Sequence, residues 1–176
     1  MMAASPPGRT RAFISYSHKD SQYLEQLKEH LGYFARNGTI DFWDDKKLIP
    51  GSKWRDEIKE AIRSAKVAIL LISPAFLNSD FIATDELPAV FDAAEKEGVL
   101  ILPVILRPCL FEETVLAQFQ TVNDPSQPWS GMLDHERDQV WVRVVKQVKE
   151  ALKKDKGQWL EEGHARYRAG EHNAAL

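Results

Sequence analysis

Glu86 is the carboxylate best placed for chemistry in this sequence. It follows the apolar run 67–73 and opens a segment with helical spacing, and Asp80 and Asp85 lie nearby. A carboxylate held rigidly in a site that excludes water can stabilise positive charge that develops on a substrate. The ordinary alternative is a first-turn glutamate favoured by the helix macrodipole. The residues alone leave both interpretations open.

Other chemistries lack the residues that they need. Asp41, Asp44 and Asp45 could suggest a metal or phospho-acceptor cluster. A response-regulator pocket would also need acids at the end of the first strand, where this chain has Ser15-Tyr16-Ser17. The five histidines show no ligand spacing, and one cysteine cannot form an internal disulfide or a Cys-rich zinc site. No glycine-rich phosphate loop occurs. We expect no metal and no resident cofactor.

Composition excludes several classes of protein. The 176 residues are 44% hydrophobic and 28% charged, which fits one globular domain with an appendage. The net charge of −3 gives no electrostatic case for a nucleic-acid partner. The first residues contain no apolar signal segment, and the longest apolar runs are too short to span a membrane. We therefore expect a cytoplasmic protein.

The elements that must position Glu86 alternate between strands and helices. Strands are predicted at 12–17, 40–43, 67–73 and 99–106, with a possible edge strand at 119–123. Helical spacing predicts helices between them and a last long helix through residues 140–152. This alternation predicts an α/β fold, a flavodoxin-like five-stranded parallel sheet flanked by helices.

In such a sheet, ligands bind beyond the carboxyl ends of the strands where the strand order reverses. That point lies between the first and third strands. The segments that reach it are Tyr16-Ser17-His18-Lys19 and Ser73-Pro74 with the residues after them, and Asp44 adds its loop from the second strand. We therefore expect Glu86 to meet these segments.

Four motifs occur in the order typical of one family. They are Phe13-Ile14-Ser15-Tyr16-Ser17, Leu48-Ile49-Pro50-Gly51, Val67–Ser73 with Phe76–Asp80 and Glu86-Leu87, and Pro103–Cys109. Together they resemble the boxes of the Toll/interleukin-1 receptor (TIR) domain, in its bacterial or archaeal type. The resemblance covers about residues 10–152 and implies the TIR fold.

The resemblance implies NAD⁺ as a substrate. TIR domains of bacterial defence systems include enzymes that cleave NAD⁺ with a glutamate at the position of Glu86. Nicotinamide is cationic in NAD⁺ and leaves as a neutral group, so a general acid is not needed. A carboxylate beside the ribose would stabilise the oxocarbenium-like transition state. Glu86 is thus the expected catalytic residue of an NAD⁺ nucleosidase that gives ADP-ribose or a cyclic form.

The same resemblance implies the residues that bind the substrate. Tyr16, Ser17 and His18 match the loop that lines the pocket, and Asp44 sits at the mouth of the second loop. Trp54 matches the aromatic residue that stacks on the leaving base. Ile82 stands where the family often has tryptophan, four residues before the glutamate.

Leu48, Ile49, Pro50 and Gly51 resemble the family's self-association surface. This implies that other TIR domains are partners, in a homo-oligomer or filament that activates the enzyme in a defence or stress pathway. The expected organisation is a flexible leader at 1–10, a TIR domain at 11–152, and a linker with a truncated helical segment at 153–176. In that segment, the spacing of Trp159, Gly163, Tyr167, Gly170 and Ala175 resembles the start of a tetratricopeptide repeat, and a repeat array would bind a sensing partner.

Two other functions remain open on the sequence. One is a non-catalytic TIR adaptor that acts by homotypic contacts. The other is a nucleoside-transferring enzyme of the related deoxyribosyltransferase architecture, which also uses a glutamate. Loss of an activity on replacing Glu86 separates the enzyme from the adaptor, and base exchange onto free nucleobases separates the transferase.

Overall fold

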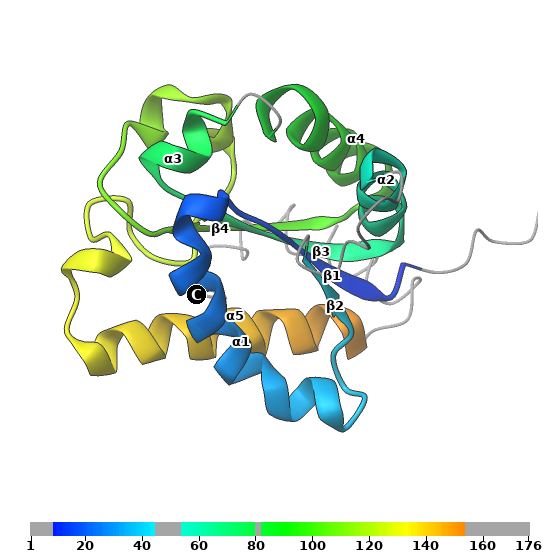
Figure 1. The fold of residues 1–176 in the computed structure, drawn as a ribbon, viewed down its shortest axis with the longest axis horizontal. Helices are drawn as coiled ribbons and strands as arrows, with labels where there is room; N and C mark the ends of the chain where they lie inside the picture. Colours follow the sequence, from blue (N-terminus) through cyan, green and yellow to red (C-terminus); the bar gives the residue numbers. More distant parts are fainter. Residues whose placement is uncertain (1–8, 45–53, 80–81, 154–176) are drawn as a thin grey trace, which may run out of the picture.

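A parallel four-stranded sheet forms the centre of the molecule in the computed structural model, which describes residues 9–44, 54–79 and 82–153 (Figure 1). The strands are β1 (Arg11–Ser15), β2 (Phe42–Trp43), β3 (Ala65–Ile72) and β4 (Leu100–Ile105), in the order β2-β1-β3-β4. This order reverses between β1 and β3, as the flavodoxin-like prediction requires. The α/β fold class is therefore confirmed.

The helices lie on both faces of the sheet. They are α1 (Ser21–Arg36), α2 (Trp54–Ser64), α3 (Pro74–Leu77), α4 (Leu87–Glu97) and α5 (Asp134–Lys153). In Figure 1, α1 and α5 lie below the sheet, and α2, α3 and α4 lie above it. Helices on both faces bury both sides of the strands, which explains why β3 is apolar along nearly all its length.

Alternation along the strands sorts side chains into two cores. Ala12 and Ile14 of β1 pack on the face covered by α1 and α5. Phe13 faces α2 and α4, and its ring stacks on Trp43 at 5.4 Å between centroids. Successive strand residues point to opposite faces, so Ser15 shares the α2/α4 face with Phe13.

Two glycines end helices as their positions predict. Gly38, just after α1, has φ of 79°, and Gly98, the C-cap of α4, has φ of 70°. Glycine adopts this left-handed conformation without steric cost, so the backbone can leave each helix within one residue.

Residues 119–123 do not form the possible fifth strand, although they lie beside β4. The Val122 N–H donates to the Pro103 carbonyl at 2.8 Å. The next residue, Asn123, bonds to β4 through its side chain and not through its backbone. Its Oδ1 accepts from the Ile105 N–H at 2.9 Å, and its Nδ2 donates to the Ile105 carbonyl at 3.0 Å. The described residues therefore contain four strands rather than five, because the Asn123 amide makes the hydrogen bonds to Ile105 that a fifth strand would make.

Replacing Asn123 with alanine is expected to lower the free energy of unfolding by about 2–4 kcal/mol, because buried polar groups of Ile105 lose their partners. Urea denaturation followed by circular dichroism measures this change. The control is Gln120→Ala, an exposed residue of the same segment. Equal, small effects of the two substitutions would show that the Asn123 bonds contribute little.

Two residues that precede the predicted boundary at residue 11 contact the domain. Arg9 donates from Nη1 to the carbonyls of Ile62 and Ala65, at 2.8 and 3.1 Å, and from Nε to Glu97 at 2.9 Å. The Thr10 N–H donates to the Ser64 carbonyl. Arg9 and Thr10 are thus hydrogen-bonded to α2 and to the start of β3, and the predicted leader at 1–10 stays a prediction. Among the described helices, none combines the length and apolar character needed to cross a bilayer.

Candidate functional site

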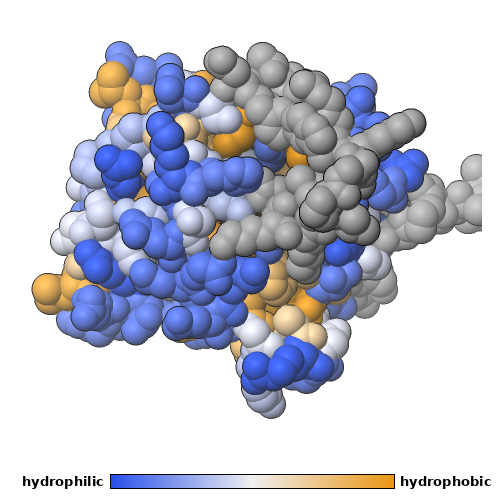
Figure 2. All heavy atoms as spheres, viewed as in Figure 1, coloured by the Kyte–Doolittle hydropathy of each residue, from blue (hydrophilic) through white to orange (hydrophobic). Residues whose placement is uncertain are grey.

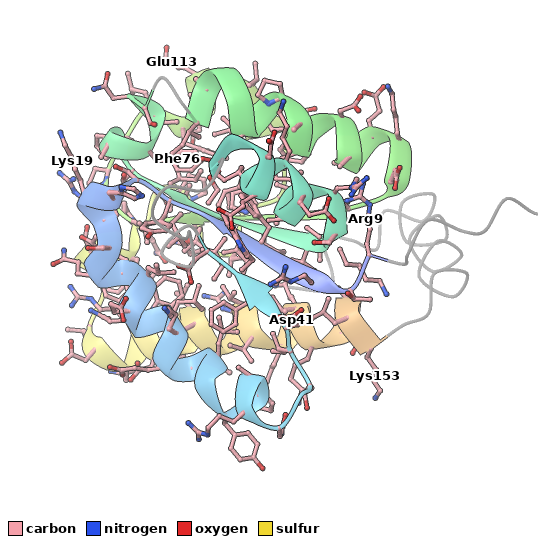
Figure 3. The ribbon with its side chains drawn as sticks, turned by 45° about the vertical axis from the view of Figure 1, so that its right-hand side comes forward. Arg9, Lys19, Asp41, Phe76, Glu113 and Lys153 are labelled. Carbon is pink, nitrogen blue, oxygen red and sulfur yellow. The ribbon has the colours of Figure 1, made fainter. Side chains whose placement is uncertain are left out.

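The candidate site lies at the carboxyl ends of β1 and β3. Figure 3 shows Lys19, from the turn after β1, and Phe76, from α3 after β3, at the same end of the molecule. The short helix η1 (His18–Asp20) and the π-helical turn η3 (Ile82–Glu86) complete this edge. Two segments distant in the sequence therefore meet where the strand order reverses.

Glu86 is buried at this edge and bonded to β1. Its side chain is 6% exposed, and its Oε1 accepts a hydrogen bond from Ser15 Oγ at 2.9 Å. Ser15 is the last residue of β1 and is itself 2% exposed. The sequence pattern places Ser15 in the first strand but does not indicate a role for it at the site. The feature that could have indicated a role is the residue type: Ser15 is polar, whereas Phe13, on the same face of the strand, is apolar.

Glu86 does not serve α4 as an ordinary capping residue. It occupies the N-cap position, but its side chain makes no capping hydrogen bond. Pro88, in the first turn of α4, lacks an N–H and reduces the number of donors that need a cap. The carboxylate instead reaches back to the strand, which weakens the interpretation of Glu86 as a residue retained only for helix stability.

A second buried serine–carboxylate pair lies at the same edge. Ser73 Oγ donates to the carboxylate of Asp20, and both side chains are almost completely buried. Ser73 Oγ also accepts from the Phe76 N–H at 3.0 Å, which caps α3. Ser73 and Pro74 start this short helix, which helical spacing does not predict, because they supply a cap and a proline at its first position.

The predicted substrate-binding residues after β1 are divided between the core and the surface. Tyr16 is buried among the residues of the α1/α5 core. Ser17 is the N-cap of η1 and accepts from the Lys19 N–H. His18 is exposed, and its ring lies 5.7 Å from that of Tyr16. Of the three predicted substrate-binding residues after β1, Ser17 and His18 are therefore accessible at the surface.

Asp44 lies on the other face of the sheet from Glu86. Its carboxylate is fully buried, and Oδ2 lies 3.6 Å from the Lys28 ammonium of α1. A buried carboxylate requires such a partner. Asp44 therefore anchors the end of β2 to α1, and its contact with a substrate stays a prediction.

The remaining predicted residues are located only in part. Ile82, the first residue of η3, is buried in the α2/α4 core beneath the site. Trp54 begins α2, and its side chain lies outside the part of the chain that the structure describes, as do the predicted self-association residues Leu48–Gly51 and the repeat-like segment after Lys153. Their roles stay predictions.

The cysteine thiol and the possibility of a metal site can be examined in the described residues. Burial raises the pKa of the Cys109 thiol, which reduces the thiolate available at neutral pH. Within residues 9–44, 54–79 and 82–153, no three His, Cys, Asp or Glu side chains form a group that could hold a metal. A hollow of about 440 Å³ is lined by Thr39 and Lys153 at the amino end of the sheet, away from Glu86.

Comparison with known proteins identifies the family. The family model described as "TIR domain" matches residues 12–151. Among curated proteins, the uncharacterized protein y4lF of Sinorhizobium fredii is 27% identical over 139 residues, which cover 79% of this chain and 42% of that protein. The stimulator of interferon genes protein of Magallana gigas is 32% identical over 96 residues, which cover 54% and 22%. The chain thus spans less than half the length of these relatives.

Solved structures share the fold. The TIR domain of the Toll-related receptor TRR-2 from Hydra magnipapillata has a TM-score of 0.50 at 15% identity and covers 78% of this chain and 97% of its own. The TIR-STING receptor from C. gigas has a TM-score of 0.51 at 21% identity, with 86% and 43% covered. The TIR domains of the activated Roq1 resistosome have a TM-score of 0.50 at 16% identity, with 90% and 99% covered. Since the family model spans most of the sequence, the chain belongs to the TIR-domain family.

Proposed function

We propose that this TIR domain cleaves the bond between nicotinamide and ribose in NAD⁺, with Glu86 as the catalytic residue. The observation that carries the proposal is the burial of the Glu86 carboxylate at the edge where β1 and β3 end, held by Ser15. Burying a carboxylate costs free energy that a role in helix stability alone does not explain. Ligands of open α/β sheets bind at this kind of edge.

The chemistry requires little beyond one fixed negative charge. The bond between ribose C1′ and the nicotinamide nitrogen breaks, and its electron pair neutralises the pyridinium. Positive charge then develops on the ribose, and a carboxylate in a site of low dielectric constant stabilises it more strongly than in water. Water attacks C1′ and releases a proton to give ADP-ribose; attack by a group of the same dinucleotide gives a cyclic product.

The surface segment after β1 supports the binding role proposed for Ser17 and His18. His18 lies in η1 and Ser17 caps it. Asp20 of η1 is bound to Ser73 after β3, so the segment is held at the same edge as Glu86. Trp54 would stack on the nicotinamide, and Ile82 would shape the site from the α2/α4 core. Tyr16 and Asp44 are proposed as further substrate contacts from the ends of β1 and β2.

Self-association is the second part of the proposal. The similar Roq1 TIR domains come from an activated resistosome, which is an assembly. On the described part of the face in Figure 2, apolar colour forms separate spots within a mostly hydrophilic surface. The residues proposed to form the contact between copies are Leu48–Gly51, which would complete or cover the site of a neighbour. A TIR adaptor without catalysis, acting by the same contacts, is the alternative.

Measuring activity at low and at high local concentration of the protein distinguishes the enzyme from the adaptor and tests control by assembly. Purified chain is incubated with NAD⁺, either dilute in solution or tethered at high density on lipid vesicles, and nicotinamide is measured by chromatography. We expect release by the tethered protein and at least tenfold less per molecule by the dilute protein, because a site completed by a neighbour needs assembly.

The outcomes are distinct. Equal release per molecule in both conditions would support the enzyme and reject control by assembly. No release in either condition, with the circular dichroism spectrum of a folded α/β protein, would reject the enzyme and favour the adaptor.

A further inference from the structure

The two serine–carboxylate pairs at the site join the ends of the neighbouring strands β1 and β3. Ser15 ends β1 and binds Glu86, which follows β3 in the sequence. Ser73 follows β3 directly and binds Asp20, which follows β1. Each strand end thus holds a carboxylate from the segment after the other strand. The four side chains are between 0 and 6% exposed, so these bonds are shielded from water.

Serine at position 15 does not fit the alternation of the strand unless it has a polar partner. The preceding residue on the same face, Phe13, packs in the α2/α4 core, and the β3 residue opposite Ser15 is the apolar Leu70. A buried hydroxyl is unfavourable unless it is hydrogen-bonded. A residue that breaks the local pattern and is satisfied by one specific partner is expected at a functional site.

The bond fixes the orientation of the Glu86 carboxylate. Glutamate has three side-chain torsions, and the terminal one is soft, so burial alone leaves the direction of its oxygens undetermined. A hydroxyl that donates at 2.9 Å from the end of a central strand sets that direction from a rigid element.

We infer that Ser15 is the positioning residue for Glu86 in the proposed cleavage of NAD⁺. The inference rests on the proposed function. Ser15 does not touch the substrate; it holds one carboxylate oxygen so that the carboxylate faces the ribose as charge develops. Its contribution falls on the transition state and therefore on kcat.

The test compares Ser15→Ala and Ser15→Cys with the wild-type chain under the conditions in which the wild type releases most nicotinamide. Cysteine keeps nearly the volume of serine but is a weak donor. We expect both variants to lower kcat by about tenfold to a hundredfold, normalised to the folded fraction, and to leave KM for NAD⁺ within about threefold. A structural defect alone would lower the folded fraction without lowering the normalised kcat.

The matched control is Ser64→Ala. Ser64 is also a serine with a hydrogen bond, from its Oγ to the Ala61 carbonyl at 3.1 Å, but it lies at the end of α2, before β3. We expect its kcat and KM to equal those of the wild type. Normal kcat in Ser15→Cys, with the wild type active, would overturn the role of Ser15 and leave the proposed function intact. A wild type that is inactive at every density would overturn both.

Discussion

Glutamine in place of Glu86 is expected to lower nicotinamide release by about 10²–10³-fold, measured as kcat with NAD⁺ under the most active condition of the wild type. Glutamine has nearly the shape of glutamate, and its amide oxygen can still accept from Ser15. The substitution therefore removes the negative charge and keeps the packing. Rate is lost because an amide dipole stabilises a developing cation less than a carboxylate does.

Glu95→Gln is the control for this prediction. Glu95 is an exposed residue of the same helix, α4, and the substitution removes the same charge from the chain. We expect activity within twofold of the wild type. Equal activity of the two glutamine variants would show that the reaction does not depend on the carboxylate at the strand edge, and the adaptor would then be favoured.

Alanine in place of Trp141 is expected to destabilise the fold more than the other substitutions considered, by about 3–5 kcal/mol in the free energy of unfolding. Trp141 of α5 is fully buried, and its ring lies 5.6 Å from that of Trp129. Tyr23 of α1 packs edge-on against Trp129 at 5.1 Å, so Trp141 belongs to an aromatic cluster that joins α1 to α5. Its loss leaves a cavity that the sheet and two helices cannot fill.

Guanidinium unfolding followed by circular dichroism at 222 nm measures this effect, and Val142→Ala is the control. Val142 is the next residue of α5 and is 40% exposed. We expect its substitution to change stability by less than about 1 kcal/mol. Similar midpoints for the two alanine variants would contradict the assignment of Trp141 to a rigid core.

The central strand and the ends of two helices could be predicted from the sequence because their signals are local. The run Val67–Ser73 is apolar at every position but the last, which is typical of a strand buried on both faces. Gly38 and Gly98 mark helix ends by their own conformational freedom. Such signals need no knowledge of distant partners, so β3 lies close to its predicted place.

The edge beyond β4 could not be predicted, because its structure depends on one long-range contact. Residues 119–123 have the composition of a strand, but Asn123 pairs with Ile105 through its side chain. Nothing in the local pattern distinguishes that amide from a loop asparagine. The short helix α3 was missed for a related reason, since four residues are too few for helical spacing to appear.

At the site, the position of Glu86 could be predicted and its partner could not. The switch point between β1 and β3 follows from topology, which places Glu86 near the end of β1. Alternation along the strands, however, puts Tyr16 in the α1/α5 core, and Asp44 pairs with Lys28 of α1. Ser15, between apolar neighbours, is the residue that meets Glu86. Alternation along β1 places Ser15 on the same face of the sheet as Phe13. This indicates a role for Ser15 only once Glu86 is known to be its partner.

The contacts of Arg9 determine how this domain can be joined to others. Arg9 and Lys153 both lie at the amino end of the sheet, at the opposite end of the molecule from Lys19 and Phe76 (Figure 3). The two ends of the described chain, Arg9 and Lys153, thus lie on the side remote from Glu86. An attachment at Arg9 or Lys153 leaves the edge with Glu86 pointing outward, so copies held by a common anchor would present this edge in one direction.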